Sequence, residues 1–213
     1  GHSDRRILRL GEGVDRDHLL RPAAIARVVE TLRDWRTVIN SHHVDAQIAV
    51  ATSAVRNARN REEFLGRVKQ EVGFDVEIIS GEEEARRTLL GIRSGLPVGV
   101  SSMLGLDIGG GSTEFMLDRP GHAPLIRSIE IGVVRLTERL LTSDPPTADE
   151  IQAARELIAK EAEQARAVLG ELGGVTLVGT AGSITTLAAM AQKLTTYEPI
   201  RIHNYRLSLE TVR

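Results

Sequence analysis

A run of three glycines at 109–111 lies between two acids, Asp107 and Glu114, with an apolar stretch on either side. Because glycine has no Cβ, its backbone N–H groups can approach an anion closely, so the run could cradle a phosphate group. Asp107 could then hold a divalent cation or a water molecule, and the hydroxyls of Ser112 and Thr113 would add donors. The same glycines would also suit a hairpin turn between two strands. The segment therefore predicts either a phosphate-binding loop or a hairpin.

A second glycine turn, GTAGS at 179–183, follows an apolar strand pattern and precedes a helical one. A helix N-terminus offers unbonded N–H donors and the positive end of the helix dipole, so an anion could bind there. Close packing of the strand against the helix would explain the same glycines. The run at 109–111 is neither a P-loop nor a dinucleotide-binding turn, because no Gly-Lys-Ser or Gly-Lys-Thr follows it and the next segment is predicted to be a strand.

Two further segments carry charged residues that could serve a phosphate site. SGEEEAR at 80–86 places three acids in the first turn of a helix, where acids are favoured in any case. Glu84 lies beside the apolar positions of that helix and could face a cleft as a general base. Arg56 follows a strand in a loop rich in arginine, which suits either an anion site or a solvated surface.

The elements that must position these residues alternate between strands and helices. The spacing of apolar residues predicts strands at 6–10, 47–51, 76–79, 126–131 and 177–178, and two strands joined by the glycine turn within 104–117. It predicts helices that begin near Pro22, after Asn60 (capped by that residue with Glu63), after Ser80 and after Thr147 (with a capping box to Glu150), and one at 184–194. This alternation is typical of an α/β protein.

Composition limits the classes of partner. The 213 residues include no cysteine, which excludes disulfides, thiolate nucleophiles and cysteine-bound zinc. The net charge of −2 provides no field that attracts nucleic acid or anionic lipid, and no apolar run is long enough for a membrane helix. We therefore expect a cytoplasmic protein that binds neither nucleic acid nor membrane.

Taken together, these stretches resemble the exopolyphosphatase / guanosine pentaphosphate phosphohydrolase (Ppx/GppA) family of the actin-like phosphotransferase superfamily. The matching stretches, in the family's order, are RLGEGVD (9–15), ATSAVRNARN (51–60), IISGEEEAR (78–86), LDIGGGSTE (106–114), IGVVRLTE (131–138) and GTAGSITTLAAM (179–190). The resemblance implies an actin-like ATPase (ribonuclease-H-like) fold, in which two α/β subdomains enclose a cleft.

The resemblance also implies an activity and a set of site residues. The activity would be Mg²⁺-dependent release of the terminal phosphate of inorganic polyphosphate, or of the 5′ γ-phosphate of guanosine pentaphosphate. Glu84 would be the general base, and Asp107 and Glu114 would be the acids at the metal and the catalytic water. The implied phosphate-binding residues are Gly109, Gly110, Gly111, Ser112, Thr113, Arg56, Gly179, Thr180, Gly182 and Ser183. A homodimer is the implied assembly.

The sequence departs from the family pattern at both ends. The family begins with a strand–turn–strand that carries its own Asp-x-Gly-Ser/Thr-Asn loop, and it continues beyond the last residue of this chain. We therefore expect subdomain I at 1–100, truncated at its N-terminal side, and subdomain II at 101–213, truncated at its C-terminal side. Such a fragment would have weak or no activity unless another chain supplied the missing strands.

Two other functions remain open. One is a binding protein of the same fold that senses polyphosphate or nucleotide without turnover. The other is an actin-like ATPase or sugar kinase, which would share the glycine turns but couple them to an adenosine pocket. The partner that the resemblance implies is inorganic polyphosphate or guanosine penta- or tetraphosphate. The sequence does not choose between polyphosphate and guanosine pentaphosphate.

Overall fold

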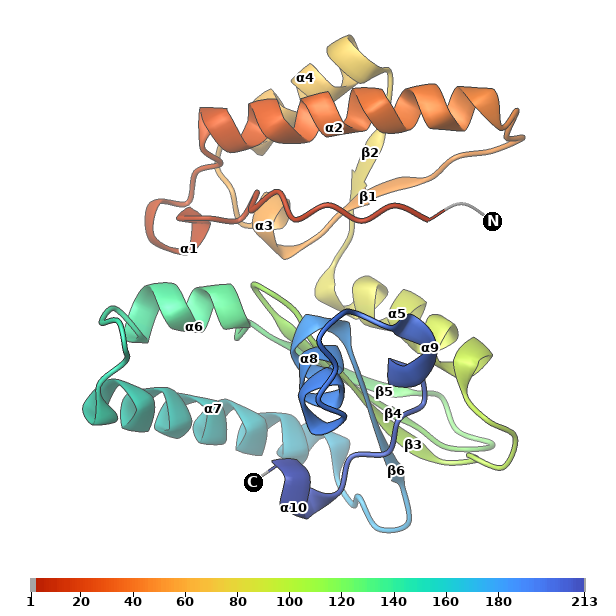
Figure 1. The fold of residues 1–213 in the computed structure, drawn as a ribbon, viewed down its shortest axis with the longest axis vertical. Coiled ribbons are helices and arrows are strands. Elements are labelled where there is room, and N and C mark those ends of the chain that lie inside the picture. The colour runs from red at the N-terminus through yellow and green to blue at the C-terminus, as the bar shows by residue number, and fades with distance from the viewer. Residues whose placement is uncertain (1–2, 213) are drawn as a thin grey trace. The chain divides into compact units, whose positions relative to one another are not determined.

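The computed structural model describes residues 3–212, which divide into two compact units. The first unit extends to Ser80 and the second begins at Gly81 (Figure 1). The division lies earlier than the expected one after residue 100, because helix α5 (Gly81–Gly95) packs on the strands of the second unit. No helix within residues 3–212 has the length and apolarity needed to span a membrane.

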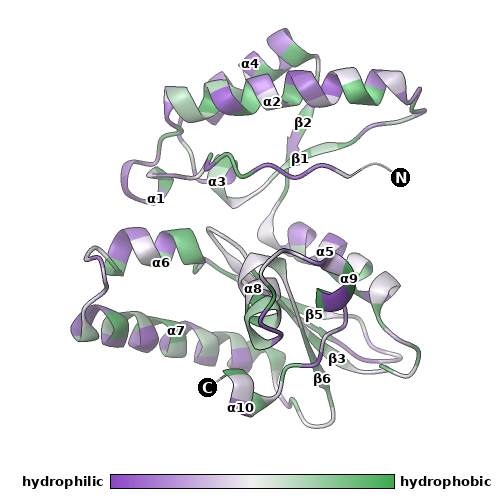
Figure 2. Ribbon diagram, viewed as in Figure 1, coloured by the Kyte–Doolittle hydropathy of each residue, from purple (hydrophilic) through white to green (hydrophobic). Residues whose placement is uncertain are grey.

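The first unit packs helices on a short parallel sheet. Its strands β1 (Ala49–Ala51) and β2 (Val76–Ile78) pair in parallel, with Ala49 opposite Val76. Its helices are α1 (Val14–Asp17), α2 (Pro22–Ser41), α3 (Ser53–Arg56) and α4 (Arg61–Val72). Pro22 suits the first turn of α2, whose apolar and polar residues alternate in bands along the helix (Figure 2). Ile25 and Val29 of α2 and Val68 of α4 are buried in the core between them.

Two expectations for the first unit are wrong. No strand forms at 6–10, where the chain is irregular and enters a turn at Leu10, with Leu8 and Leu10 against the core. Asn60 precedes α4, but its side chain makes no capping hydrogen bond. Its amide instead binds the backbone of Leu20, accepting from the N–H at 2.8 Å and donating to the carbonyl at 3.0 Å. The long-range contact to the backbone of Leu20 has replaced the local cap.

The second unit contains a mixed sheet in the order β5-β4-β3-β6. Strands β3 (Met103–Ile108), β4 (Thr113–Asp118) and β5 (Leu125–Ile129) form an antiparallel meander, and β6 (Thr176–Thr180) runs parallel to β3. The remaining helices are α6 (Val133–Leu140), α7 (Ala148–Leu169), α8 (Ala181–Ala191), α9 (Pro199–Ile202) and α10 (Leu209–Val212). The expected strands and helices of this half are therefore present.

Helices cover both faces of this sheet. Ala85 and Leu89 of α5 pack with Met103 and Met116 on one face. Gly105 lies directly under α5, where a Cβ would press on methionine and isoleucine side chains. On the other face, Ile129 of β5 and Ala165 of α7 belong to a second cluster. The predicted capping box at Thr147 and Glu150 is present at the start of α7.

Candidate active site

Two of the predicted acids are neighbours across the sheet of the second unit. In the register of β3 and β4, Asp107 lies directly opposite Glu114. On the other side of β3, Thr180 of β6 is the partner of Asp107. Because directly paired residues project from the same face of a sheet, these three side chains form one row. The row lies at the end of β3 that leads into the glycine loop, here defined as residues 109–112.

Helix α5 adds a third carboxylate and a hydroxyl to this row. Glu84 and Thr88 are four residues apart and therefore share one face of the helix. The Thr88 hydroxyl donates to Asp107 Oδ2 at 3.3 Å. Glu84 lies close enough to Glu114 for its charge to raise the pKa of that carboxyl. The structure thus brings Glu84, Asp107 and Glu114 together.

Glu114 is the most enclosed of these acids, with 1% of its surface exposed. Ser128 Oγ donates to its Oε1 at 2.8 Å, and the Ser112 hydroxyl also bonds to it. Burial raises the pKa of Glu114 to about 7, the serine hydroxyls oppose that rise, and the charges of Glu84 and Asp107 add to it. At neutral pH this site therefore favours either a proton or a bound cation.

Asp107 lies in the same environment and is less enclosed than Glu114. Burial raises the pKa of its carboxyl, and the hydrogen bond from Thr88 partly opposes the rise. Within residues 3–212, no group of three or more metal-ligating side chains is arranged to hold an ion. An ion at this row would therefore be coordinated by one or two carboxylates, with the remaining positions taken by water or substrate oxygens, as is usual for Mg²⁺.

The first turn of α6 fixes the carbonyl groups of the glycine loop. The N–H of Val133 donates to the Gly109 carbonyl at 3.0 Å, and the N–H of Val134 donates to the Gly110 carbonyl at 2.9 Å. Arg135 Nε donates to the Gly111 carbonyl at 2.9 Å. Three successive carbonyls of the loop are therefore bonded to one short segment.

This bonding determines where the N–H groups of the loop point. In a trans peptide the C=O and the N–H of the same unit point in opposite directions. Because the carbonyls of 109–111 face α6 and Arg135, the N–H groups of 110–112 point away from them. Within the described part of the chain, no hydrogen bond to the N–H of Gly110 or Gly111 is present. A set of adjacent outward N–H groups is the usual form of a backbone anion site.

Gly132 allows α6 to approach the loop so closely. A Cβ at Gly132 would lie well inside van der Waals contact with the peptide joining Gly110 to Gly111. The hairpin itself is closed by the Gly109 N–H, which donates to the Ser112 carbonyl at 3.0 Å. The two interpretations of the glycine run are therefore compatible, since the loop is a hairpin whose N–H groups also point away from α6.

Thr113 has a different role from the expected phosphate contact. Its side chain is buried, and its hydroxyl donates to the Ile131 carbonyl at 2.6 Å. This bond attaches β4 to the segment that leads into α6, so Thr113 supports the loop and does not present a donor to a ligand. Ser112 is also buried, and its hydroxyl is bonded to Glu114, which leaves its backbone N–H as the group that faces outward.

The second glycine turn spans the end of β6 and the start of α8. Gly179 and Thr180 end the strand, and Gly182 and Ser183 lie in the first turn of the helix. Gly179 is also required for packing, because a Cβ there would press on the side chain of Ile184. The partner of Gly179 in the sheet is Leu106, so Thr180 rather than Gly179 shares the face of Asp107.

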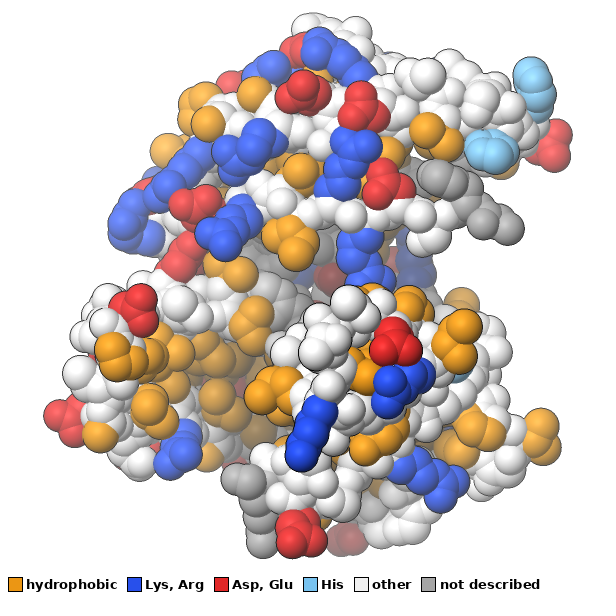
Figure 3. Space-filling view, viewed as in Figure 1, with side chains coloured by type: hydrophobic (Ala, Val, Ile, Leu, Met, Phe, Trp, Pro, Cys, Tyr) orange, Lys and Arg blue, Asp and Glu red, His pale blue; other side chains and the backbone are white. Residues whose placement is uncertain are grey.

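Arg56 is located in the first unit, at the end of α3. Its Nη1 donates to the Ile79 carbonyl at 2.8 Å, and the Ile79 N–H donates in turn to the Ala51 carbonyl. Several other arginines of this unit are paired with acids, among them Arg21 with Glu12. Basic and acidic side chains are accordingly interspersed on the visible face of the first unit (Figure 3).

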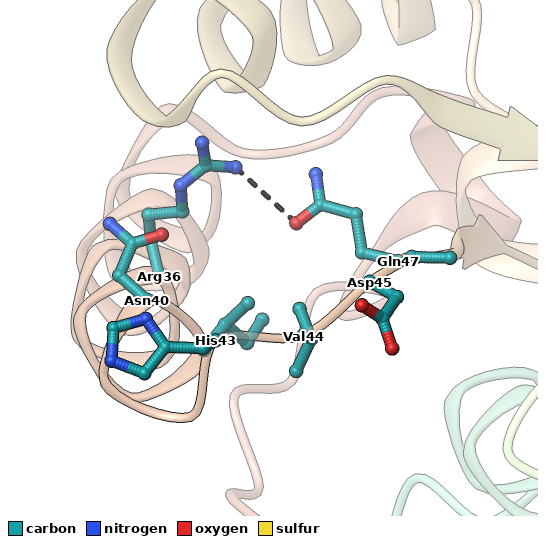
Figure 4. Close-up of a pocket in the computed structure, with 8 residues that line it drawn as sticks. Arg36, Asn40, His43, Val44, Asp45 and Gln47 are labelled. Carbon is teal, nitrogen blue, oxygen red and sulfur yellow. Dashed lines mark hydrogen bonds between the residues drawn. The ribbon is translucent and has the colours of Figure 1, made fainter.

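A hollow in the first unit contains none of the predicted site residues. It lies between the end of α2 and residues 43–47 (Figure 4). Arg36 contributes the main cationic group, but its guanidinium stacks over Phe74 and donates to Gln47 Oε1 at 3.3 Å. These contacts already use the guanidinium, so the hollow offers little to a phosphate ligand.

Sequence reasoning assigned no role to four residues that shape the site. They are Thr88, Ser128, Gly132 and Arg135. Thr88 could have been noticed because it lies one helical turn after Glu84. Gly132 could have been noticed as a glycine directly before a helix in the stretch IGVVRLTE, whereas nothing in the spacing connects Ser128 or Arg135 to their partners.

Comparison with known proteins identifies relatives along the whole chain. A family model described as the Ppx/GppA phosphatase family matches residues 2–213. The chain is 40% identical over 214 residues to Exopolyphosphatase 2 of Mycobacterium tuberculosis, a match that covers 97% of this chain and 66% of that protein. It is 33% identical over 187 residues to Guanosine-5′-triphosphate,3′-diphosphate pyrophosphatase of Aeromonas hydrophila, covering 86% of this chain and 37% of that protein.

Solved structures of similar proteins share the fold. An exopolyphosphatase-like protein superposes with a TM-score of 0.91 at 35% identity, covering 97% of this chain and 66% of the other. The Ppx/GppA family member of Aquifex aeolicus superposes with a TM-score of 0.78, also at 35% identity and with the same coverage. These similarities confirm the expected α/β fold. The chain spans about two thirds of the length of these two structures.

Proposed function

The chain belongs to the Ppx/GppA phosphatase family, as its motifs indicated, and we propose that it hydrolyses a terminal phosphoanhydride bond of polyphosphate or of guanosine pentaphosphate. One observation carries the proposal: the glycine loop, with its outward N–H groups, joins the two strands on which Asp107 lies opposite Glu114. An anion cradle beside the buried Glu114 and the half-buried Asp107 offers what phosphoryl transfer to water needs, namely charge stabilisation and a positioned nucleophile.

The glycine loop binds the terminal phosphate in this proposal. The N–H groups of residues 110–112 donate to its oxygens, and they need no reorganisation because α6 already fixes the opposite side of each peptide. Thr180 lies next to Asp107 in the sheet, and the first turn of α8, which follows Thr180 along the chain, supplies further donors. Arg56, which lies in the first unit, stays a predicted phosphate contact that rests on the family resemblance alone.

Glu84 acts as the general base on the attacking water. It is placed by the same helical face that carries Thr88 onto Asp107, so its carboxylate belongs to the row that faces the loop. Asp107 and Glu114 orient this water and hold it in line with the phosphorus atom. General-base catalysis of this kind typically accelerates a reaction by about 10²–10⁴-fold.

The carboxylates fit a divalent cation, for which we propose Mg²⁺. Burial raises the pKa of both Asp107 and Glu114, so each carboxylate is stabilised by a positive charge beside it. Asp107, which is less enclosed than Glu114, would hold the ion, and Glu114 would assist it. The bound ion would neutralise charge on the phosphate oxygens.

The substitution Glu84→Gln tests the proposal. We expect phosphate release from long-chain polyphosphate or guanosine pentaphosphate to fall at least about 10²-fold, with substrate binding retained. The matched control is Glu83→Gln, which changes a neighbouring acid that is paired with Arg87 at 2.7 Å on the helix surface. Release is measured with Mg²⁺ and with EDTA, on this chain and on a version extended to the relatives' length.

The alternatives give different results in the same assay. Equal turnover by wild type and Glu84→Gln would remove Glu84 from the mechanism. Binding of polyphosphate or guanosine pentaphosphate without any release, even by the extended chain, would indicate a sensor. Release from ATP in place of both substrates would indicate an actin-like ATPase.

A further inference from the structure

We propose that Arg135 is a positioning residue that holds the glycine loop in its anion-binding conformation. The proposal rests on the proposed function, since it concerns how the same loop is kept ready for phosphate. Arg135 is near the start of α6 and faces the side of the loop opposite its outward N–H groups. It therefore acts through the backbone of the loop and does not touch the phosphate.

Arg135 contacts the loop twice and is itself held in place. Its backbone N–H donates to the Gly110 carbonyl at 3.2 Å, and its Nε donates to the Gly111 carbonyl at 2.9 Å. Its Nη2 donates to Glu130 Oε2 at 2.6 Å, which fixes the plane of the guanidinium. The side chain is only 13% exposed. Two adjacent carbonyls of the turn are thus bonded to one enclosed residue.

The glycines explain why such a clamp is needed. Glycine adopts positive and negative φ values with similar ease, so the peptides around Gly110 and Gly111 could rotate at little cost. Rotation of the peptide between Gly111 and Ser112 would replace an outward N–H with an outward carbonyl oxygen. That oxygen would repel a phosphate. The bond from Arg135 to the Gly111 carbonyl opposes this rotation.

A guanidinium suits the task better than an ammonium group. Its donors lie in one plane at fixed angles, so Nε and Nη2 can serve the Gly111 carbonyl and Glu130 together. A lysine could reach one of these acceptors but would not fix the direction of a bond to the other. Arg135→Lys is therefore expected to lie between wild type and Arg135→Ala.

Two quantities are measured separately: the backbone rigidity of the loop and its affinity for a phosphate ligand. Backbone ¹⁵N relaxation of Gly110, Gly111 and Ser112 is measured by NMR, and tripolyphosphate is titrated into the same samples. For Arg135→Ala we expect these three amides to lose order and the affinity to fall about tenfold or more, as for the loss of a hydrogen bond from a charged group. Added guanidinium should restore part of both.

Arg93→Ala is the matched control. Arg93 also bridges an acid and two carbonyls in the second unit, those of Asp118, Val100 and Ser101, but none belongs to the glycine loop. Its loss should change stability and leave the loop amides and the tripolyphosphate affinity within about threefold of wild type. Glu130→Gln, which keeps the arginine but weakens its anchor, should give a smaller version of the Arg135→Ala effect.

The outcomes separate this proposal from the proposed function. Unchanged order at residues 110–112 in folded Arg135→Ala would overturn the positioning role, whatever the protein binds. Lost order with weakened binding would support both proposals. Lost order in a chain whose wild type does not bind tripolyphosphate would support the clamp and contradict the phosphate site. If Arg135→Ala does not fold, Arg135→Lys and Glu130→Gln provide the same readouts.

Discussion

At the scale of single residues, Glu114 combines deep burial with a position between two other acids. Hydrogen bonds from two serine hydroxyls stabilise its charged form. Burial and the charges of Glu84 and Asp107 destabilise that form more strongly. In the folded protein the proton is therefore bound more tightly than in the unfolded chain. Glu114 is a group whose charge costs stability unless a cation is present.

The pH dependence of stability follows from this. A pKa raised from the usual 4.5 to about 7 corresponds to about 3 kcal/mol, at about 1.4 kcal/mol for each pKa unit. Because the folded-state pKa is the higher one, this contribution is fully present below pH 4.5 and is lost as the pH rises through 7. We expect Glu114→Gln to become more stable relative to wild type by about that amount between pH 4.5 and pH 8 without Mg²⁺, as measured by urea unfolding.

Glu150 provides a control of opposite sign. Hydrogen bonds from the Thr147 backbone and the Thr142 hydroxyl are the main causes that lower the pKa of its carboxyl to about 2. Its contribution is present above its usual pKa of 4.5 and is lost as the pH falls through about 2. Glu150→Gln should therefore differ from wild type least in acid. A constant difference between Glu114→Gln and wild type across pH would contradict the buried, charge-coupled state of Glu114.

At the scale of elements, the contact between α6 and the glycine loop depends on the absence of one side chain. Gly132 has an extended φ of −143°, which any residue can adopt, so only the lack of a Cβ is needed there. A methyl group at that position would press on the peptide between Gly110 and Gly111. The helix would have to move away, and the bonds from Val133 and Val134 to the loop would lengthen.

We expect Gly132→Ala to destabilise the protein by about 1–3 kcal/mol, as overpacking does, and to weaken phosphate binding through the displaced loop. Gly91→Ala is the control. Gly91 lies within α5 with open space around its Cβ position, so alanine there should stabilise by about 0.5–1 kcal/mol. Thermal unfolding and tripolyphosphate titration measure both effects. A Gly132→Ala protein as stable and as tightly binding as wild type would show that α6 does not position the loop.

The sequence predicted elements whose signals are local, and it missed contacts between distant segments. The capping box joins Thr147 to Glu150, only three residues further along the chain. The glycine run lies between two apolar strands that pair with each other directly as a hairpin. Arg135 lies 24 residues from Gly111 along the chain, so neither helical nor strand periodicity connects them. Asn60 has a still more distant partner in Leu20, 40 residues away, which is why the cap expected from its local sequence did not form.

At the scale of the whole molecule, the two units have separate cores. One cluster lies between α2, α4 and the short parallel sheet, and two others lie on the two faces of the four-stranded sheet. The site acids all belong to the second unit, whereas Arg56 belongs to the first. Apolar side chains also remain exposed in the second unit, notably over α6 and α7 (Figure 3).

The exposed edge of the four-stranded sheet gives a prediction about association. In the described chain β6 pairs only with β3, and its sequence TLVGT has no charged residue. Leu177 in this strand is 65% exposed. An uncharged edge strand readily pairs with the same strand of another copy, whereas a lysine discourages that pairing. We therefore expect wild type to self-associate with rising concentration and Leu177→Lys to do so less.

Ile200→Lys is the control that distinguishes an effect at the sheet edge from a general effect of added positive charge. Ile200 is 92% exposed on the short helix α9, so the substitution adds the same charge to a surface that cannot extend the sheet. Sedimentation velocity over a range of concentrations should show reduced association for Leu177→Lys and wild-type behaviour for Ile200→Lys. Equal reduction in both would indicate general repulsion between chains. No reduction in either would place the contact elsewhere, with the apolar side chains over α6 and α7 as the next surface to test.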